Sequence, residues 1–233
     1  MLVFDWKAFI SFATLFILVL SLGIWQINRG YEKKELEHTY FVKQSMPVEE
    51  IKNNNDLKTK NLYRNIVIEG SYHDQSFYVD NKTNQGKAGV KVVMPFDLLD
   101  GSSILVSRGW IPFTNRNILP EIETPSGVIK IQGILRPVSE SFLLEDEEMQ
   151  PKQNPLLVQS INLKQISDYT KISLMPFIIE LSELSPSGFI STWKPLNLSS
   201  MRHFGYAAQW FGLGLVLIVG YIFFLRRGID KLK

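Results

Sequence analysis

The stretch from Phe204 to Leu225 constrains the fold of this chain most strongly. It contains no charged residue, and Gln209 is its only strongly polar side chain. As an α-helix with a rise of 1.5 Å per residue, the stretch is about 33 Å long, enough to cross a bilayer core of roughly 30 Å. A soluble helix of this length is expected to keep one polar face. The sequence therefore predicts a transmembrane helix over residues 204–225.

Polar residues mark both ends of this predicted helix. Arg226 and Arg227 follow it, and Arg202 and His203 lie at the other water boundary. The serines at 199–200 are suited to cap the helix N-terminus. We therefore expect an ordered helix with defined ends.

A helical wheel divides this stretch into two faces. One face groups a histidine, two aromatic residues and two small residues: His203, Tyr206, Ala207, Trp210 and Gly214. The opposite face carries only small residues: Gly205, Ala208 and Gly212. Small residues let two membrane helices approach closely. The second face is therefore expected to pack against another span.

A second apolar stretch, Ala8 to Trp25, lies near the start of the chain. It is longer than the apolar region of a usual signal peptide, and Trp25-Gln26 follow it without a small-x-small cleavage site. No Arg-rich, Ser-rich presequence precedes it. We therefore expect an uncleaved anchor, with a transmembrane helix over residues 8–27 that continues into water as far as Gln44.

Two spans place both termini on the same side of a membrane. The tail is basic, and Lys7 precedes the first span; basic flanks favour the cytoplasmic side. Basic residues also follow the first span, but a long loop crosses the membrane largely regardless of its charge. We expect a bacterial cell inner membrane protein with both termini cytoplasmic and residues 28–198 forming a periplasmic domain.

Between the two spans, the periodicity changes to that of β-strands. Runs rich in Val, Ile and aromatic residues, separated by turn residues, lie at 64–72, 76–80, 88–99, 102–112, 127–137 and 173–181. Asp100-Gly101 predicts a hairpin, and residues 162–170 predict one amphipathic helix. The predicted fold is a membrane protein of the α+β class. Its N- and C-terminal transmembrane helices flank a mostly antiparallel β-barrel-like or sandwich domain.

Composition and motifs exclude several kinds of function. The 233 residues carry a net charge of +2, which provides no basic stripe for nucleic acid, and the absence of cysteine excludes thiolate sites. No catalytic motif is recognisable, so no enzymatic activity is expected. The acidic run at 145–148 and the pair Glu35 and His38 are interpreted as solvated surface. Arg108 and Trp110 are interpreted as a structural stack at a strand end.

A cluster of aromatic, basic and amide side chains is expected where the two spans meet the outer water boundary. A helical hairpin brings together Trp25, Gln26, Arg29, Arg202, His203, Tyr206 and Trp210. One interpretation is an aromatic belt with arginines that extend into water, and spacing alone favours it. The other interpretation is a binding site, in which the imidazole of His203 ligates a metal and the arginines bind carboxylates.

Three separated motifs resemble those of one family. GIWQINRGYEK (23–33) resembles the G-x-W-Q-x-x-R-x-x-x-K signature of the surfeit-locus family of cytochrome oxidase assembly factors. LVSRGWIP (105–112) resembles its V-x-R-G-W-I-P segment, and HFGYAAQWFGLG (203–214) resembles its closing H-x-x-Y-A-x-Q-W-F motif. The resemblance covers nearly the whole chain in the same order of span, soluble domain and span.

The resemblance implies a chaperone role in the biogenesis of respiratory chain complex IV. The implied partners are the catalytic subunit of cytochrome oxidase and, further, the proteins of haem a synthesis. The implied cofactor is haem a, with its iron ligated by His203. Ala207 and Gly214 are expected to leave room for the flat ring, and Arg29 and Arg202 to pair with its propionates. Two alternatives stay open: a cofactor-free membrane scaffold that binds the oxidase subunit, and an extracytoplasmic sensor or enzyme.

The predicted topology can be tested with reporter fusions at Asn54 and after Lys233. A reporter that works only in the periplasm should be active at Asn54 and silent after Lys233, because the long loop is expected outside and the basic tail inside. Activity of the same reporter at the tail would overturn the assignment.

Overall fold

The chain folds into two compact units. The computed structural model describes residues 6–51, 57, 59–113, 118–138, 154–194 and 199–230. One unit comprises residues 1–41 together with 195–233, and the other comprises residues 42–194. The acidic run at 145–148 lies outside the described residues.

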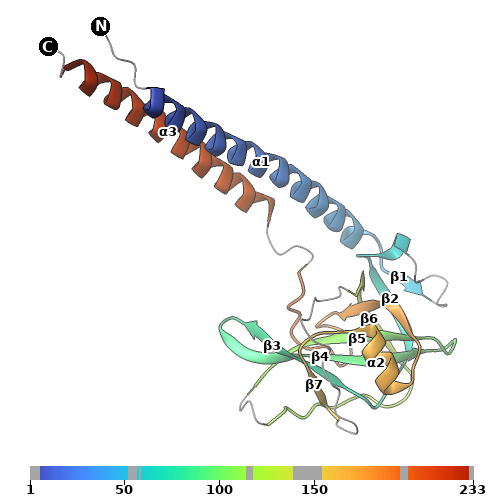
Figure 1. Ribbon diagram of the computed structural model, residues 1–233. Helices are drawn as coiled ribbons and strands as arrows, with labels where there is room; N and C mark the ends of the chain where they lie inside the picture. Colours follow the sequence, from blue (N-terminus) through green and yellow to red (C-terminus); the bar gives the residue numbers. More distant parts are fainter. Residues whose placement is uncertain are drawn as a thin grey trace. The chain divides into compact units, whose positions relative to one another are not determined.

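The first unit is a pair of long antiparallel helices, α1 (Trp6–Ser45) and α3 (Ser200–Asp230). They lie side by side, so the first residue of α1 and the last residue of α3 are at the same end of the pair (Figure 1). Both helices are long and apolar enough to cross a membrane, and only 11% and 6% of their most apolar windows are buried. The large apolar side chains therefore face outward, unlike those of the core helix of a soluble protein. The two flanking helices and the helical continuation of the first one as far as Gln44 are confirmed.

Aromatic rings seated over glycines hold the two helices together. The ring of Phe204 covers Gly30 and the ring of Phe211 covers Gly23, so the contacts are spaced seven residues apart on both helices. A methyl group at Gly30 would lie 2.6 Å from Phe204 Cε1, and one at Gly23 would lie 2.8 Å from Phe211 Cε1. Close backbone approach with ring contact supplies the van der Waals attraction that membrane helices need.

The expectation that Gly205, Ala208 and Gly212 pack against the first span is wrong. A methyl group at Gly205 or Gly212 would meet no atom within 4 Å, and Ala208 is exposed. The face of Ala207, which is 3% exposed, packs on α1 instead. The physical reason is that the small residues that admit the partner lie on α1, where they receive aromatic rings from α3.

The second unit is a β-barrel with additional strands. The strand order is β1 (Glu49–Ile51), β2 (Asn65–Tyr72), β6 (Ile129–Pro137), β8 (Leu174–Leu181), β5 (Ser103–Pro112), β4 (Lys87–Leu98), β3 (Phe77–Asn84) and β7 (Leu156–Val158). Because β2 also pairs with β4, the strands β2, β6, β8, β5 and β4 close into a ring (Figure 1). Closure removes exposed edges from these strands. Of the two predicted architectures, the barrel is confirmed.

Alternation along the strands separates two apolar layers. The barrel interior is filled by side chains such as Ile68, Phe96 and Leu135. A second layer, which includes Val93 and Ile178, lies on the outer wall under β7 and α2 (Leu163–Thr170). The period of two in strands directs successive residues to these opposite faces.

Each of the six predicted strand regions contains a strand, and the predicted helix is α2. The hairpin between β4 and β5 turns at Gly101 (φ +81°), where Asp100 Oδ1 accepts a hydrogen bond from the Ser102 N–H. Strands β1 and β7 were not predicted. Each has only three residues and pairs in parallel, which is too short for a period-two pattern to be recognised.

The motif at 107–110 forms a β-bulge that buries an arginine. On β4, Val92 pairs with Gly109 and Val93 with Ser107, so Arg108 is the additional residue. Gly109 has φ +119°, and a methyl group there would lie 2.7 Å from the backbone of Phe189. The bulge therefore needs glycine at this position.

The buried Arg108, 1% exposed, fastens loop segments to the barrel wall. Its Nε donates to the Ser187 carbonyl at 2.9 Å and its Nη2 to the Glu123 carbonyl at 2.7 Å. Its guanidinium lies 4.6 Å from the Phe189 ring centroid. The suggested stack of Arg108 on Trp110 is wrong, because the guanidinium lies over the rings of Tyr72 and Phe189 instead. The Trp110 Nε1–H donates to the Lys82 carbonyl.

Replacement of this arginine should destabilise the β unit. Arg108→Met leaves the partly buried carbonyls of Ser187 and Glu123 without their donors and removes the stack on Phe189, so the free energy of unfolding should fall by about 1–3 kcal/mol. The measurement is urea unfolding of the full chain in mild detergent, followed by tryptophan fluorescence. Lys130→Met, which removes a cation exposed on β6, should leave the midpoint close to wild type. Equal unfolding midpoints for the two variants would contradict the stabilising role of Arg108.

The register of the helical pair should depend on the two covered glycines. Gly30→Leu places a branched side chain where the Phe204 ring lies, which should cost about 1–3 kcal/mol of overpacking. Gly205→Leu is the matched control, because it makes the same change on an open face. Since the chain has no cysteine, a cysteine pair introduced at Phe12 and Tyr221, whose rings stack at 4.3 Å, reports pairing. Cross-linking should fall severalfold only for Gly30→Leu.

Candidate functional site

The candidate site is a histidine of α3 that is covered by α1. His203 is 7% exposed, and its Nδ1 lies 2.8 Å from the Gln26 Oε1. Because the amide oxygen only accepts, this contact places the imidazole proton on Nδ1. Nε2 then carries a lone pair. It is buried and has no hydrogen-bond partner among the residues that the structure describes.

Hydrogen bonds of the nearby Ser200 fix the position of His203 along the axis of α1. Three residues before it, Ser200 donates its N–H to Glu37 Oε1 at 2.9 Å and its hydroxyl to Glu37 Oε2 at 2.6 Å. The serine hydroxyl and then its N–H hold the pKa of Glu37 below the usual glutamate value. At the first residue of α3 the N–H donor is therefore satisfied by a carboxylate from α1, which also suits the positive end of the helix dipole, and capping by the serine side chains at 199–200 stays a prediction.

The direction of this pKa shift determines the pH range in which the Glu37–Ser200 contact stabilises the fold. A lowered carboxyl pKa in the folded state means that the stabilisation is present above the ordinary glutamate pKa. It is lost as the pH falls through the lowered value, when Glu37 becomes protonated. The start of α3 is therefore held to α1 at neutral pH.

The other residues predicted for this site lie on the same two helices, but the structure does not bond all of them to His203 or Gln26. Trp25, Arg29, Arg202 and Tyr206 are exposed, and Trp210 is half-buried. Arg29 already forms an ion pair with Glu32 on its own helix at 2.6 Å. Of the seven predicted residues, the hydrogen bond joins His203 and Gln26 directly.

The expected room beside Ala207 and Gly214 is not present. Ala207 is buried, and a methyl group at Gly214 would lie 3.5 Å from Phe16 Cε2 and 3.8 Å from Val19 Cγ1. These side chains of α1 occupy the space assigned to a flat ring. The expectation was wrong because it assumed that this face of α3 was unpartnered.

The donor chemistry at His203 nevertheless restricts what it can bind. Within the described part of the chain, no group of three or more His, Cys, Asp and Glu side chains is arranged to hold a metal ion. A single neutral imidazole nitrogen suits an ion that brings its other ligands with it, as haem iron does. His203 Nε2 is therefore a suitable donor for haem iron. Because this atom is buried, neighbouring side chains must move before haem can reach it.

A polar cluster in the β unit was missed by sequence analysis. Glu180 of β8 contacts Lys91 of β4 and Arg136 of β6. The available signal was a charged residue inside an otherwise apolar strand, as in the segments FIIEL and VKVVM. Such residues are rarely buried unless they are paired.

Comparisons with known proteins agree with this architecture. The SURF1 family matches residues 13–215, which include most of α1, the barrel and the first half of α3. A SURF1-like protein of Rickettsia prowazekii is 30% identical over 222 residues, covering 91% of this chain and 86% of the relative. A SURF1-like protein of Rickettsia felis is 30% identical over 225 residues, covering 92% and 95%. One from Monosiga brevicollis is 25% identical over 234 residues, covering 92% and 86%. The chain thus belongs to the SURF1 family, a family of cytochrome oxidase assembly factors.

Proposed function

We propose that this protein assists the maturation of a haem-copper oxidase by holding or passing haem a at His203. The observation that carries the proposal is the buried Nε2 atom without a partner, on a ring whose other nitrogen is fixed by Gln26. A buried polar atom without a partner costs about 1–3 kcal/mol. A ligand that accepts the lone pair of this atom offsets that cost.

A bound haem would supply an iron that accepts the lone pair of His203 Nε2, and other residues of the chain would orient the group. Gln26 holds the ring in the tautomer whose Nε2 is free, the role that hydrogen-bonded neighbours have at other metal-ligating histidines. Arg202 is exposed and available to a propionate, whereas Arg29 must exchange Glu32 for one. Trp25 and Tyr206 present exposed rings on the two helices.

The proposed location is the bacterial inner membrane, with both termini cytoplasmic and the β unit periplasmic. The basic tail and the two apolar helices support this orientation. The partner is the catalytic subunit of the oxidase, and proteins of haem a synthesis are the source of the cofactor. No catalytic step is assigned to the chain.

A second candidate is a scaffold that binds the oxidase subunit without a cofactor. The packing of Ala207 and Gly214 against α1 favours it, because no space for a macrocycle is present on that face. The exposed apolar sides of both helices are then the surface offered to the subunit.

The haem content of the protein separates the two candidates. The full chain is purified in mild detergent from a host that makes haem a, and haem absorbance is measured per protein. His203→Ala should lose the absorbance while membrane insertion is kept, and His203→Met should recover part of it with a changed spectrum. Gln26→Leu should lower haem affinity by about tenfold or more, because the tautomer is no longer fixed.

The other two histidines supply the controls. His38→Ala and His73→Ala should keep wild-type haem content, since both residues are outside the proposed site. Equal haem content in the wild type and His203→Ala would overturn the ligand assignment. A colourless wild-type protein that still co-purifies with the oxidase would favour the scaffold.

A further inference from the structure

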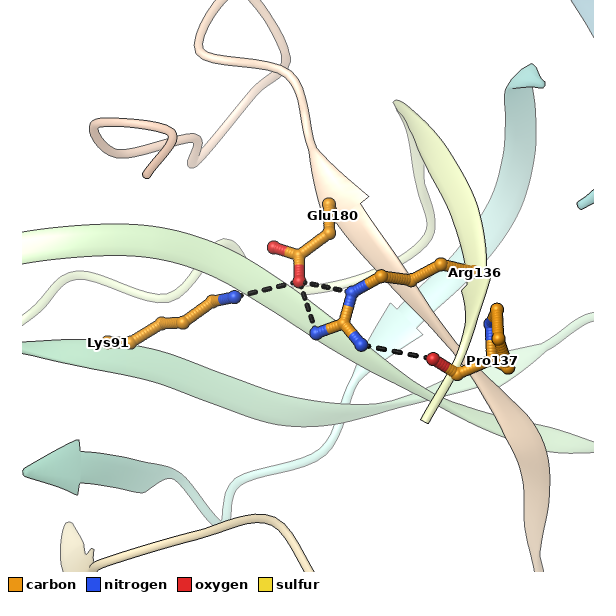
Figure 2. Close-up of polar contacts among 4 residues, drawn as sticks. All are labelled: Lys91, Arg136, Pro137 and Glu180. Atoms are coloured by element: carbon orange, nitrogen blue, oxygen red, sulfur yellow. Dashed lines mark hydrogen bonds and ion pairs between the residues drawn. The ribbon is translucent and has the colours of Figure 1, made fainter. Parts of the chain in front are cut away.

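The buried polar cluster of the β unit lies on the outer wall of the barrel. Ile179 and Leu181 of β8 fill the interior, so Glu180 between them points outward. Arg136 likewise follows the inward Leu135 on β6. Figure 2 shows Glu180 between the side chains of Lys91 and Arg136.

A single carboxylate oxygen serves both cations of this cluster. Glu180 Oε1 accepts from Lys91 Nζ at 2.7 Å and from Arg136 Nε at 2.7 Å (Figure 2). The side chains of Lys91 and Arg136 are each 13% exposed, and that of Glu180 is 4% exposed. Two nearly buried cations therefore share one buried anion, which leaves a surplus of positive charge in a medium that solvates it poorly.

The electrostatics of the cluster reflect this surplus. Burial acts to raise the pKa of Glu180, but Lys91 and Arg136 outweigh it and hold the pKa below its usual value. Burial lowers the pKa of Lys91, and Arg136 and Lys82 lower it further against the attraction of Glu180. The carboxylate stays ionised, yet it does not compensate the charges around it.

A cavity of about 110 Å³ opens beside the two cations. Its polar lining consists of Lys82, Lys91, Arg136 and Ser160, and the rest of its wall is aliphatic. Of the described residues that line it, none is acidic. Lys82 is exposed, so water-soluble molecules can reach this side of the cavity.

The cations beside the cavity keep unused donors. In Arg136, Nε and Nη2 both contact Glu180 Oε1, Nη2 at 2.5 Å, and Nη1 donates to the Pro137 carbonyl at 3.0 Å, so one N–H group remains on each terminal nitrogen. Lys91 spends one of three N–H groups on Glu180. Ser107, whose register partners are Val93 and Glu180, has a buried hydroxyl without a partner in the described chain.

We propose that this cavity binds a phosphate group, either as the free ion or at the end of a small phosphomonoester. Three cations, Lys82, Lys91 and Arg136, stand against one carboxylate, so a doubly charged oxyanion neutralises the cluster. Arg and Lys N–H groups are the donors that phosphate oxygens take in proteins. The cavity of about 110 Å³ has room for a phosphate group.

Glu180 is the positioning residue of this site. It does not line the cavity. By bonding to Lys91 and Arg136 at the same oxygen, it fixes both side chains in place before the ligand arrives. Preorganised donors bind an anion with a smaller loss of side-chain entropy.

The test uses the full chain in phosphate-free detergent buffer at constant ionic strength. Inorganic phosphate and glycerol 3-phosphate are titrated separately by calorimetry, with sodium chloride and sodium acetate as competing anion controls. Saturable binding of inorganic phosphate indicates the free ion, and tighter binding of glycerol 3-phosphate indicates a phosphomonoester. Either result supports the site. Absence of saturable binding for both probes, or equal binding of acetate, would overturn it.

Matched lysine variants locate the bound anion. Lys82→Met removes an exposed cation outside the Glu180 pair, so the variant should fold and bind phosphate about tenfold more weakly or worse. Lys130→Met removes one charge on β6 away from the cavity lining and should bind phosphate as the wild type does. If both variants bound phosphate equally weakly, the phosphate site would be overturned, and the cluster would be a structural ion network alone. The haem content of Lys82→Met should not change, which keeps this test separate from that of His203.

Discussion

The seating of Phe204 on Gly30 and of Phe211 on Gly23 is the constraint on which the helical unit depends. In a bilayer, lipid tails compete for every apolar surface, so two helices associate only where they pack more closely than lipid does. The paired contacts, spaced by seven residues, determine one register of α3 on α1. His203 opposite Gln26 and Ser200 opposite Glu37 are consequences of that register.

The β unit buries charge in two different ways. Arg108 has backbone carbonyls and aromatic faces as partners, so its charge is dispersed over dipoles and no acid is needed. Lys91 and Arg136 instead share the single carboxylate of Glu180. The first arrangement is complete within the fold, whereas the second retains unused donors beside a cavity. Only the second is therefore suited to receive a ligand.

Much of this architecture could be predicted from the sequence, because the relevant signals are local. Uncharged runs predict the spans, and alternation together with Asp100-Gly101 predicts the strands and their hairpin. Barrel closure between β2 and β4 depends on pairing between distant segments, and the three-residue strands carry too little pattern. The face of α3 that meets α1 was predicted wrongly. The prediction was based on small residues of α3, whereas the small residues in the contact are Gly23 and Gly30 of α1.

The candidate sites required knowledge of packing that no motif contains. Sequence spacing grouped six residues with His203, but only the structure shows that its Nδ1 faces Gln26 and that the ring is buried. Glu180 was overlooked because strand periodicity alone does not show that an outer wall is covered. In the folded chain its side chain is 4% exposed, and apolar residues of α2 and β7 cover part of the same wall.

Buried polar atoms without partners connect the two proposals. In the described part of the chain these atoms are Arg64 Nε, Ser107 Oγ and His203 Nε2. Arg64 is compensated by its Nη1, which donates to Glu49 and Asn61, and by its Nη2, which donates to the Pro47 carbonyl. His203 Nε2 is the proposed haem ligand, and Ser107 Oγ belongs to the residue that pairs in register with Val93, which lines the proposed phosphate cavity. A helix pair built only for anchoring, or a barrel wall built only for stability, would lose nothing with apolar residues at these positions. The cost of leaving them polar is best explained if each is offset when a ligand binds.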